Sequence, residues 1–227
     1  MARTRVILIS SIVIIGCLLI LTPLLVNRHF LLVSGIITLL TFLPFVIRFE
    51  KRRVTGRELV MLAVLAAIAA VSRVPFAAIP SVQPTSFVII MTGLVFGAES
   101  GFVVGALAAL VSNLFLGQGP WTPWQMYSWG MLGLVAGFLR NTSFMQKSYG
   151  KIIFGFISGI VYGWIMNLWY VVSLGDNFRF EEVIKYYAAS IYFDLAHAVS
   201  NAFFIIVFAN SWIKILQRFR KKYGLLE

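Results

Sequence analysis

Eight long apolar segments set the limits on what this chain can fold into. A helix needs about 20 apolar residues to cross the hydrocarbon core of a membrane. The chain has 227 residues, 60% of them hydrophobic and 12% charged, so seven or eight such crossings leave no length for a soluble domain. The sequence therefore predicts an all-α, polytopic membrane helical bundle in a lipid bilayer. The apolar segments cover residues 6–26, 30–47, 59–79, 84–97, 101–116, 126–139, 152–174 and 187–212.

The net charge of +11 is distributed unevenly between the two sides of these spans. Because cytoplasmic loops of membrane proteins carry an excess of Lys and Arg, the pattern predicts that both termini are cytoplasmic. The basic charge then marks topology, with some attraction to anionic lipid, and no nucleic-acid partner is expected without a soluble basic domain. The predicted outer side receives Arg28, Arg73, Arg179 and Lys185. The predicted inner side receives Arg3, Arg5, Arg48, Lys51, Arg52, Arg53, Arg57, Arg140, Lys147, Lys151, Lys214, Arg218, Arg220, Lys221 and Lys222.

A change in composition near residue 55 divides the chain in two. Residues 1–55 contain two Leu- and Ile-rich spans and a basic stretch, which predict an N-terminal transmembrane hairpin and a cytoplasmic linker. Residues 56–227 contain six spans, in which Gly and Ala recur four residues apart, and a basic C-terminal tail. Small residues at this spacing share a helix face and let another helix approach closely. Most of them are expected to pack helices within the chain, and the better candidates for an external partner are Ala63, Ala66, Ala67 and Ala70.

An uncharged, aromatic-rich run joins two of the spans. Residues 118–125 read Gln-Gly-Pro-Trp-Thr-Pro-Trp-Gln. Non-helical chain at membrane depth is tolerated only where protein buries it or where it lines a cavity, so Trp121 and Trp124 fit the mouth of a ligand site. An interfacial aromatic belt explains the two tryptophans equally well.

Polar side chains at membrane depth gather in the predicted outer half of the bundle, and the inner half is almost purely apolar. A proton or ion pathway would need polar groups through the full depth, whereas a pocket open to the outside would not. The pattern therefore favours a pocket. The side chains concerned are Arg73, Gln83, Asn113, Gln118, Gln125, Asn167, Asp194, His197 and Asn201.

Asp194 is the most costly of these residues, because a carboxylate near the centre of a membrane helix costs about 2.5–3.5 kcal/mol on insertion scales. Arg73 is the cation at comparable depth and is its expected partner, in a substrate site or in a purely structural ion pair. His197 is open to three interpretations: a hydrogen-bonded packing residue, a cavity-lining residue, or a contact to a metal-bearing ligand. Belt anchoring does not fully explain Trp164, which is added to the candidate site.

The sequence contains none of the common catalytic motifs. It has no H-E-x-x-H, no G-x-S-x-G and no Walker A loop, and its single cysteine, Cys17, cannot form a cysteine metal cluster. No catalytic residue, no metal site and no cofactor of its own are predicted. Uphill transport would therefore draw its energy from a partner or from an ion gradient.

Residues 56–212 resemble the S component, the substrate-binding membrane subunit, of an energy-coupling factor (ECF) vitamin transporter, and are most similar to the cobalamin-type S components. The most specific motif is the Gly-Gln-Gly-Pro-Trp-Thr-Pro-Trp-Gln run that starts at Gly117. The runs that precede it in family order are Thr55-Gly-Arg-Glu-Leu, Pro84-Thr-Ser-Phe, Gly93-Leu-Val-Phe-Gly and Gly101-Phe-x-x-Gly-Ala-Leu-Ala-Ala-Leu-Val-Ser-Asn.

The resemblance implies a six-helix core in a bacterial plasma membrane that binds a micronutrient from outside. It also implies docking on a transmembrane T component with two cytoplasmic ATPases that use ATP, and toppling of the S component to carry the ligand inward. The family's alanine motif, which meets the T component, matches Ala63, Ala66, Ala67 and Ala70, and the aromatics that cover the ligand match Trp121 and Trp124. The spans 6–26 and 30–47 depart from the six-helix pattern.

Cobalamin would suit a wide site with many amides, because its corrin is large, flat and rich in amide side chains. Riboflavin and a pyridoxine are the alternatives within the family. A proton-coupled secondary transporter that uses Asp194 and His197 as a relay is the alternative from another class, and a membrane scaffold is a third. The amides available to a vitamin are Gln83, Asn113, Gln118, Gln125 and Asn167.

Overall fold

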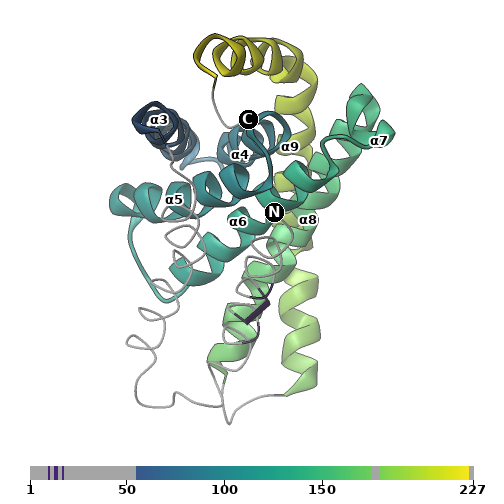
Figure 1. The fold of residues 1–227 in the computed structure, drawn as a ribbon. Helices are drawn as coiled ribbons and strands as arrows, with labels where there is room; N and C mark the ends of the chain where they lie inside the picture. Colours follow the sequence, from purple (N-terminus) through teal and green to yellow (C-terminus); the bar gives the residue numbers. More distant parts are fainter. Residues whose placement is uncertain (1–9, 11–12, 15–16, 18–54, 175–178, 225–227) are drawn as a thin grey trace.

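The computed structural model describes residues 55–174 and 179–224, together with positions 10, 13, 14 and 17. Apart from those four positions, the predicted spans 6–26 and 30–47 lie outside the described residues. The described ranges are helical (Figure 1), which confirms the predicted all-α class. Four of these helical segments are long and apolar enough to cross a membrane. The elements are α3 (Gly56–Arg73), the 3-10 turn η1 (Val74–Phe76), α4 (Pro84–Phe96), α5 (Ala98–Leu116), α6 (Thr122–Leu139), α7 (Ser143–Gln146), α8 (Ser148–Ser173) and α9 (Phe180–Tyr223).

Helix α3 begins three residues before the predicted span and ends earlier. Thr55 Oγ1 accepts a hydrogen bond from the Glu58 backbone N–H at 3.3 Å, and the Glu58 carboxylate accepts one from the Thr55 N–H at 2.9 Å. This capping box fixes the start of the helix. At the other end Pro75 lacks the N–H that an α-helix requires, so the chain passes into η1 instead of continuing to residue 79.

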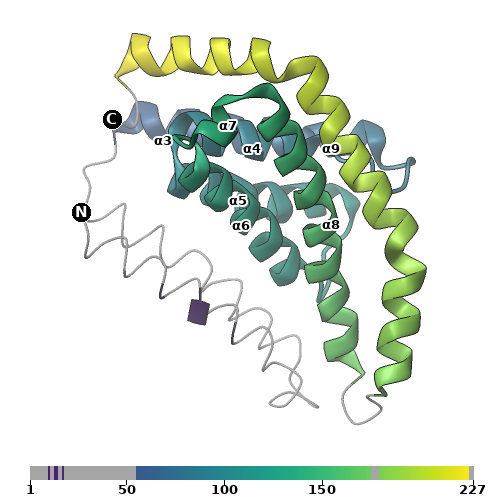
Figure 2. The same ribbon diagram turned by 90° about the vertical axis from the view of Figure 1, so that its right-hand side faces the viewer.

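Helix α4 forms the centre of the fold. Every residue of this helix except Leu94 is buried. A helix that is apolar around its whole circumference must be enclosed on all sides by other elements. Helices α3, α5, α6 and the later part of α9 surround α4 in this way (Figures 1 and 2).

Glycines bring α5 and α6 into close contact. A Cβ atom on Gly101 or on Gly133 would collide with the backbone of the other residue, and one on Gly137 would collide with the backbone of Ala98. Side chains therefore cannot separate the two helices here. The prediction that these small residues pack helices within the chain is confirmed for this pair.

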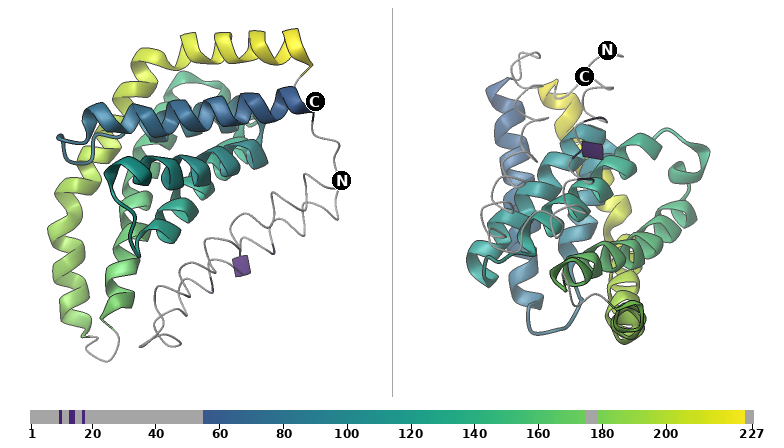
Figure 3. Two further views of the ribbon diagram at one scale, coloured as in Figure 1. Left: turned by 90° about the vertical axis from the view of Figure 1, so that its left-hand side faces the viewer. Right: turned by 90° about the horizontal axis from the view of Figure 1, so that it is seen from below.

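Helices α8 and α9 form an antiparallel hairpin beside the α3–α6 bundle, and α9 then turns across the bundle (Figures 2 and 3). Gly159 of α8 lies against the backbone of Ala198 of α9. The last part of α9, residues 212–223, is here called the C-terminal arm. Trp212 packs edge-on against Phe87 at 5.3 Å between ring centroids, and Arg220 Nη1 donates to the Val95 carbonyl at 3.1 Å. The helix thus continues to Tyr223, well beyond the predicted end at residue 212.

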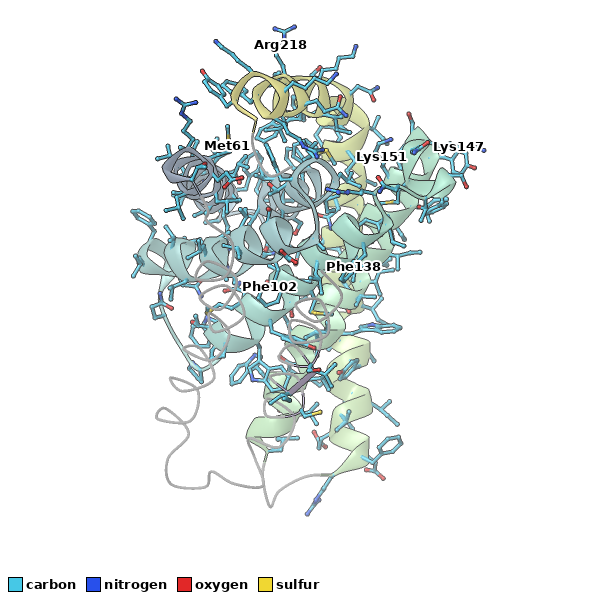
Figure 4. The ribbon with its side chains drawn as sticks, in the orientation of Figure 1. Met61, Phe102, Phe138, Lys147, Lys151 and Arg218 are labelled. Atoms are coloured by element: carbon cyan, nitrogen blue, oxygen red, sulfur yellow. The ribbon has the colours of Figure 1, made fainter. Side chains whose placement is uncertain are left out.

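Basic side chains gather towards one end of the molecule. Lys147, Lys151 and Arg218 lie in the upper part of Figure 4, away from the end of α8. All three belong to the set predicted for the cytoplasmic side. The orientation of the chain in a membrane stays a prediction.

Candidate functional site

A chain of hydrogen-bonded polar side chains begins at Arg73, the last residue of α3. Its Nη1 donates to Ser112 Oγ at 3.0 Å and to Asn113 Oδ1 at 2.8 Å, both on α5. The guanidinium carbon lies 5.2 Å from the centre of the Trp129 ring, within the range of a cation–π contact. The Arg73 guanidinium, the one permanent charge among these side chains, therefore contacts only neutral groups here.

Asn113 extends the chain from α5 to α6. Its Nδ2 donates to Gln125 Oε1 at 2.7 Å and lies 3.1 Å from Thr122 Oγ1. Gln125 Nε2 in turn donates to the Tyr162 hydroxyl of α8 at 3.1 Å. Asn113 is 1% exposed and Gln125 is 3% exposed. Since buried amides are costly unless they are hydrogen-bonded, this network holds four helices in one arrangement.

Aromatic rings continue the network to α9. Trp129 and Tyr162 stack at 5.2 Å between centroids, and Tyr162 meets the His197 ring edge-on at 4.7 Å. Trp129 Nε1 donates to Ser86 Oγ at 3.1 Å, and His197 Nε2 lies 2.8 Å from the same hydroxyl. We call the whole group the central cluster. It comprises Arg73, Ser86, Ser112, Asn113, Thr122, Gln125, Trp129, Tyr162 and His197.

Asp194 belongs to a separate group between α8 and α9. Its Oδ2 accepts a hydrogen bond from Ser190 Oγ at 3.2 Å, and Ser190 Oγ itself accepts one from Asn167 Nδ2 at 2.6 Å. We call Asn167, Ser190 and Asp194 the hairpin cluster. The expected ion pair between Arg73 and Asp194 is not formed, because Arg73 reaches towards α5 and Asp194 is held by its own helix. Asp194 and His197 bind different hydroxyls, so no direct hydrogen bond links the two groups of the proposed proton relay.

The aromatic run divides between a loop and a helix. Helix α6 begins at Thr122, four residues before the predicted start, because a proline such as Pro123 is favoured in a first turn. Trp124 is therefore buried in the bundle, at 3% exposure, and not in a loop. Trp121 stays half-buried, 6.0 Å from the Trp169 ring. Gln118 is exposed, and its Nε2 donates to the Leu110 carbonyl at 2.8 Å.

Two other predicted residues lie apart from the central cluster. Trp164 is 53% exposed on α8. The Gln83 backbone N–H donates to Ser200 Oγ at 3.2 Å, and its enclosed Oε1 has no hydrogen-bond partner. Of the predicted binding residues, the structure therefore brings together Arg73, Asn113, Gln125 and His197. Gln118 joins them at the edge, because its Oε1 accepts a hydrogen bond from Thr122 Oγ1 at 2.9 Å. Within the described part of the chain, no three His, Cys, Asp or Glu side chains are placed to hold a metal ion.

The four alanines predicted to meet a partner lie on two different faces of α3. Ala63 and Ala67 are exposed, whereas Ala66 and Ala70 are buried inside the bundle. Only Ala63 and Ala67 are thus accessible. Beside them, an apolar groove of about 770 Å³ runs between α3 and the C-terminal arm.

Sequence reasoning missed several members of the central cluster. Their common signal is a hydroxyl or aromatic side chain inside an apolar span, which is also typical of ordinary packing, so the sequence could not separate the two roles. The missed residues are Ser86, Ser112, Thr122, Trp129 and Tyr162.

Comparison with known proteins places the chain in a family. The family described as "ECF transporter, substrate-specific component" matches residues 57–218. A UPF0397 protein of Vibrio atlanticus (strain LGP32) is 26% identical over 103 residues, which are 43% of this chain. The match spans about half of that relative, 56% of its length. No solved structure matches the chain.

Proposed function

Because the chain belongs to the family of ECF transporter substrate-specific components, we propose that it captures a vitamin from outside the cell and passes it inward. It is a transport subunit and not an enzyme. Its partners in this proposal are a transmembrane T component and two cytoplasmic ATPases, which supply the energy of ATP hydrolysis. The membrane is the plasma membrane of a bacterium, with both termini of the chain in the cytoplasm.

The observation that carries the proposed site is the burial of amide side chains inside an otherwise apolar bundle. Asn113 is hydrogen-bonded to polar groups of both α3 and α6, and Gln125 is hydrogen-bonded to Tyr162 of α8. Without a solute these amides satisfy one another. A solute rich in amide or carbonyl groups can replace those hydrogen bonds without leaving a buried group unsatisfied.

Cobalamin is the vitamin that we propose. Its corrin ring carries many amide side chains, which match the donors and acceptors of Asn113 and Gln125. Riboflavin and pyridoxine carry fewer amide groups.

Titration of the purified chain in detergent with cobalamin, riboflavin and pyridoxine tests this choice. We expect cobalamin to bind with one molecule per chain and the other two at least about 100-fold more weakly, a difference of roughly 2.7 kcal/mol. Tighter binding of riboflavin or pyridoxine would replace the vitamin and keep the transport function. A chain that binds none of the three, and that co-purifies with no solute, would contradict the transport function itself.

We propose that the exposed face of α3 around Ala63 and Ala67 contacts the T component. Small side chains let a partner helix approach closely and separate again. Ala67→Trp should leave vitamin binding intact and reduce uptake by the complete transporter at least about tenfold. Ala189→Trp, at another exposed alanine, on α9, is the matched control and should transport normally. Normal uptake by Ala67→Trp would show that the docking face lies elsewhere.

A further inference from the structure

Arg73 has no acidic partner among the described residues. Its hydrogen bonds go to the hydroxyl of Ser112 and the amide oxygen of Asn113, which are both neutral. Asp194, the expected counter-ion, is held by Ser190 in the hairpin cluster. A permanent positive charge therefore lies at the edge of the buried polar network without a negative charge to balance it.

The guanidinium also keeps part of its hydrogen-bonding capacity. A guanidinium has five N–H donors, and both hydrogen bonds recorded here leave from Nη1. The remaining three N–H groups have no acceptor among the described residues. Some side-chain atoms in the described residues are fully enclosed and have no hydrogen-bond partner, for example Gln83 Oε1 and Asn201 Oδ1. The Arg73 nitrogens Nε and Nη2 are not among these enclosed atoms. These N–H groups therefore open onto accessible space.

The physical cost of this arrangement favours the binding of an anion by Arg73. A cation within a membrane bundle is normally paired or in contact with water, and a cation–π contact such as the one with Trp129 is worth only about 0.5–2 kcal/mol. A planar guanidinium with a free side is suited to bind a carboxylate or a phosphate through two parallel hydrogen bonds. Trp129 would fix the orientation of the Arg73 guanidinium plane, and the guanidinium edge that carries the remaining N–H groups would face the ligand.

We propose that Arg73 binds an anionic group, a carboxylate or a phosphate, of the transported solute. This inference rests on the proposed function and narrows its substrate class. Cobalamin meets the requirement through the phosphodiester of its nucleotide arm. Riboflavin and pyridoxine carry neither a phosphate nor a carboxylate, so they would leave the guanidinium unpaired.

Mass spectrometry of the small molecules that co-purify with wild-type protein, Arg73→Gln and Arg57→Gln tests the inference. Arg57 is exposed at the start of the same helix and provides the matched control. We expect the wild type and Arg57→Gln to hold the same solute, which carries a carboxylate or a phosphate. In binding titrations with that solute, the affinity of Arg73→Gln should be about 10- to 100-fold lower than that of the wild type, since hydrogen bonds to a charged group are lost. Arg73→Lys keeps the positive charge but loses the planar guanidinium, so its affinity should lie between those of the wild type and Arg73→Gln.

The possible outcomes separate this inference from the function on which it rests. A neutral or cationic solute, an unchanged affinity of Arg73→Gln, or recovery of a phospholipid in place of a soluble molecule would overturn the role of Arg73 and leave transport standing. Thermal unfolding of each variant in detergent distinguishes a lost contact from a lost fold, because Arg73→Gln with wild-type stability and weakened binding supports a direct contact. A wild-type chain without any solute would reject both proposals.

Discussion

The α3–α6 bundle and the α8–α9 hairpin treat their polar groups in opposite ways. In the bundle, Arg73 and Asn113 reach across to other helices, and the central helix α4 is buried almost completely. In the hairpin, Asp194 and Asn167 meet at one hydroxyl, that of Ser190. Many outward residues of the hairpin are apolar or aromatic. The polar network of the bundle thus spans several helices, whereas that of the hairpin is local.

This difference indicates where a solute can be recognised. A solute that enters the central cluster must exchange hydrogen bonds between helices, so its binding couples the bundle to the hairpin through Tyr162 and His197. Hydrogen bonds within the hairpin cluster join only α8 and α9, so they do not couple the hairpin to the bundle. We therefore propose that the central cluster binds the ligand and that the hairpin cluster stabilises the hairpin.

The largest expected effect separates a tryptophan of the bundle from one of the hairpin. Trp124→Ala should destabilise the protein by about 3–5 kcal/mol, because removal of a buried indole leaves a cavity. Trp164→Ala, at an exposed position on α8, should change stability by less than about 0.5 kcal/mol. Thermal unfolding of both variants in detergent measures the difference. Equal stabilities would show that Trp124 is not part of a packed core.

Two glycines provide the next comparison. Gly133→Ala would force a Cβ into the backbone of Gly101, so we expect a loss of about 1–3 kcal/mol. Gly155→Ala meets only the flexible end of the Ile205 side chain at close range, and other atoms begin at 3.6 Å. It should therefore be tolerated. Expression level and thermal unfolding report both effects, and a Gly155→Ala protein as unstable as Gly133→Ala would remove the distinction.

The smallest expected effect concerns solute affinity. Asn113→Ala removes the link between Arg73 and Gln125, and we expect affinity for the bound solute to fall about tenfold, or roughly 1.4 kcal/mol. Asn167→Ala removes a hydrogen bond of the hairpin cluster and should leave the affinity within about threefold. Binding titrations of the two purified variants decide between the clusters. A greater loss for Asn167→Ala would move the site into the hairpin.

Local sequence signals predicted the described helices well where a strong start or stop is present. The prediction of 84–97 for α4 differs from the observed helix by one residue, because Pro84 starts it and Gly97, at φ 99°, ends it. The start of α6 was misjudged, since Trp-Thr-Pro-Trp was interpreted as loop although Pro123 suits a first helical turn. The end of α9 was misjudged because a basic tail can be solvated coil or, as here, an arm that packs on α4.

The site was harder to predict than the helices. Depth in the predicted spans singled out Asn113, Gln125 and His197, which lie together in the central cluster, but depth does not tell which way a side chain points around the helix axis. For this reason Arg73 and Asp194, at similar predicted depth, were expected to pair, although their side chains join different clusters. Rotation also separates Ala67 from its neighbour Ala66, which is turned into the core.

A structure of the purified chain with its bound solute is the sharpest test of solute binding at the central cluster. We expect a solute in contact with Asn113 and Gln125, with an anionic group on Arg73. A solute bound against Asp194 and Asn167, or in the apolar groove between α3 and the C-terminal arm, would contradict it.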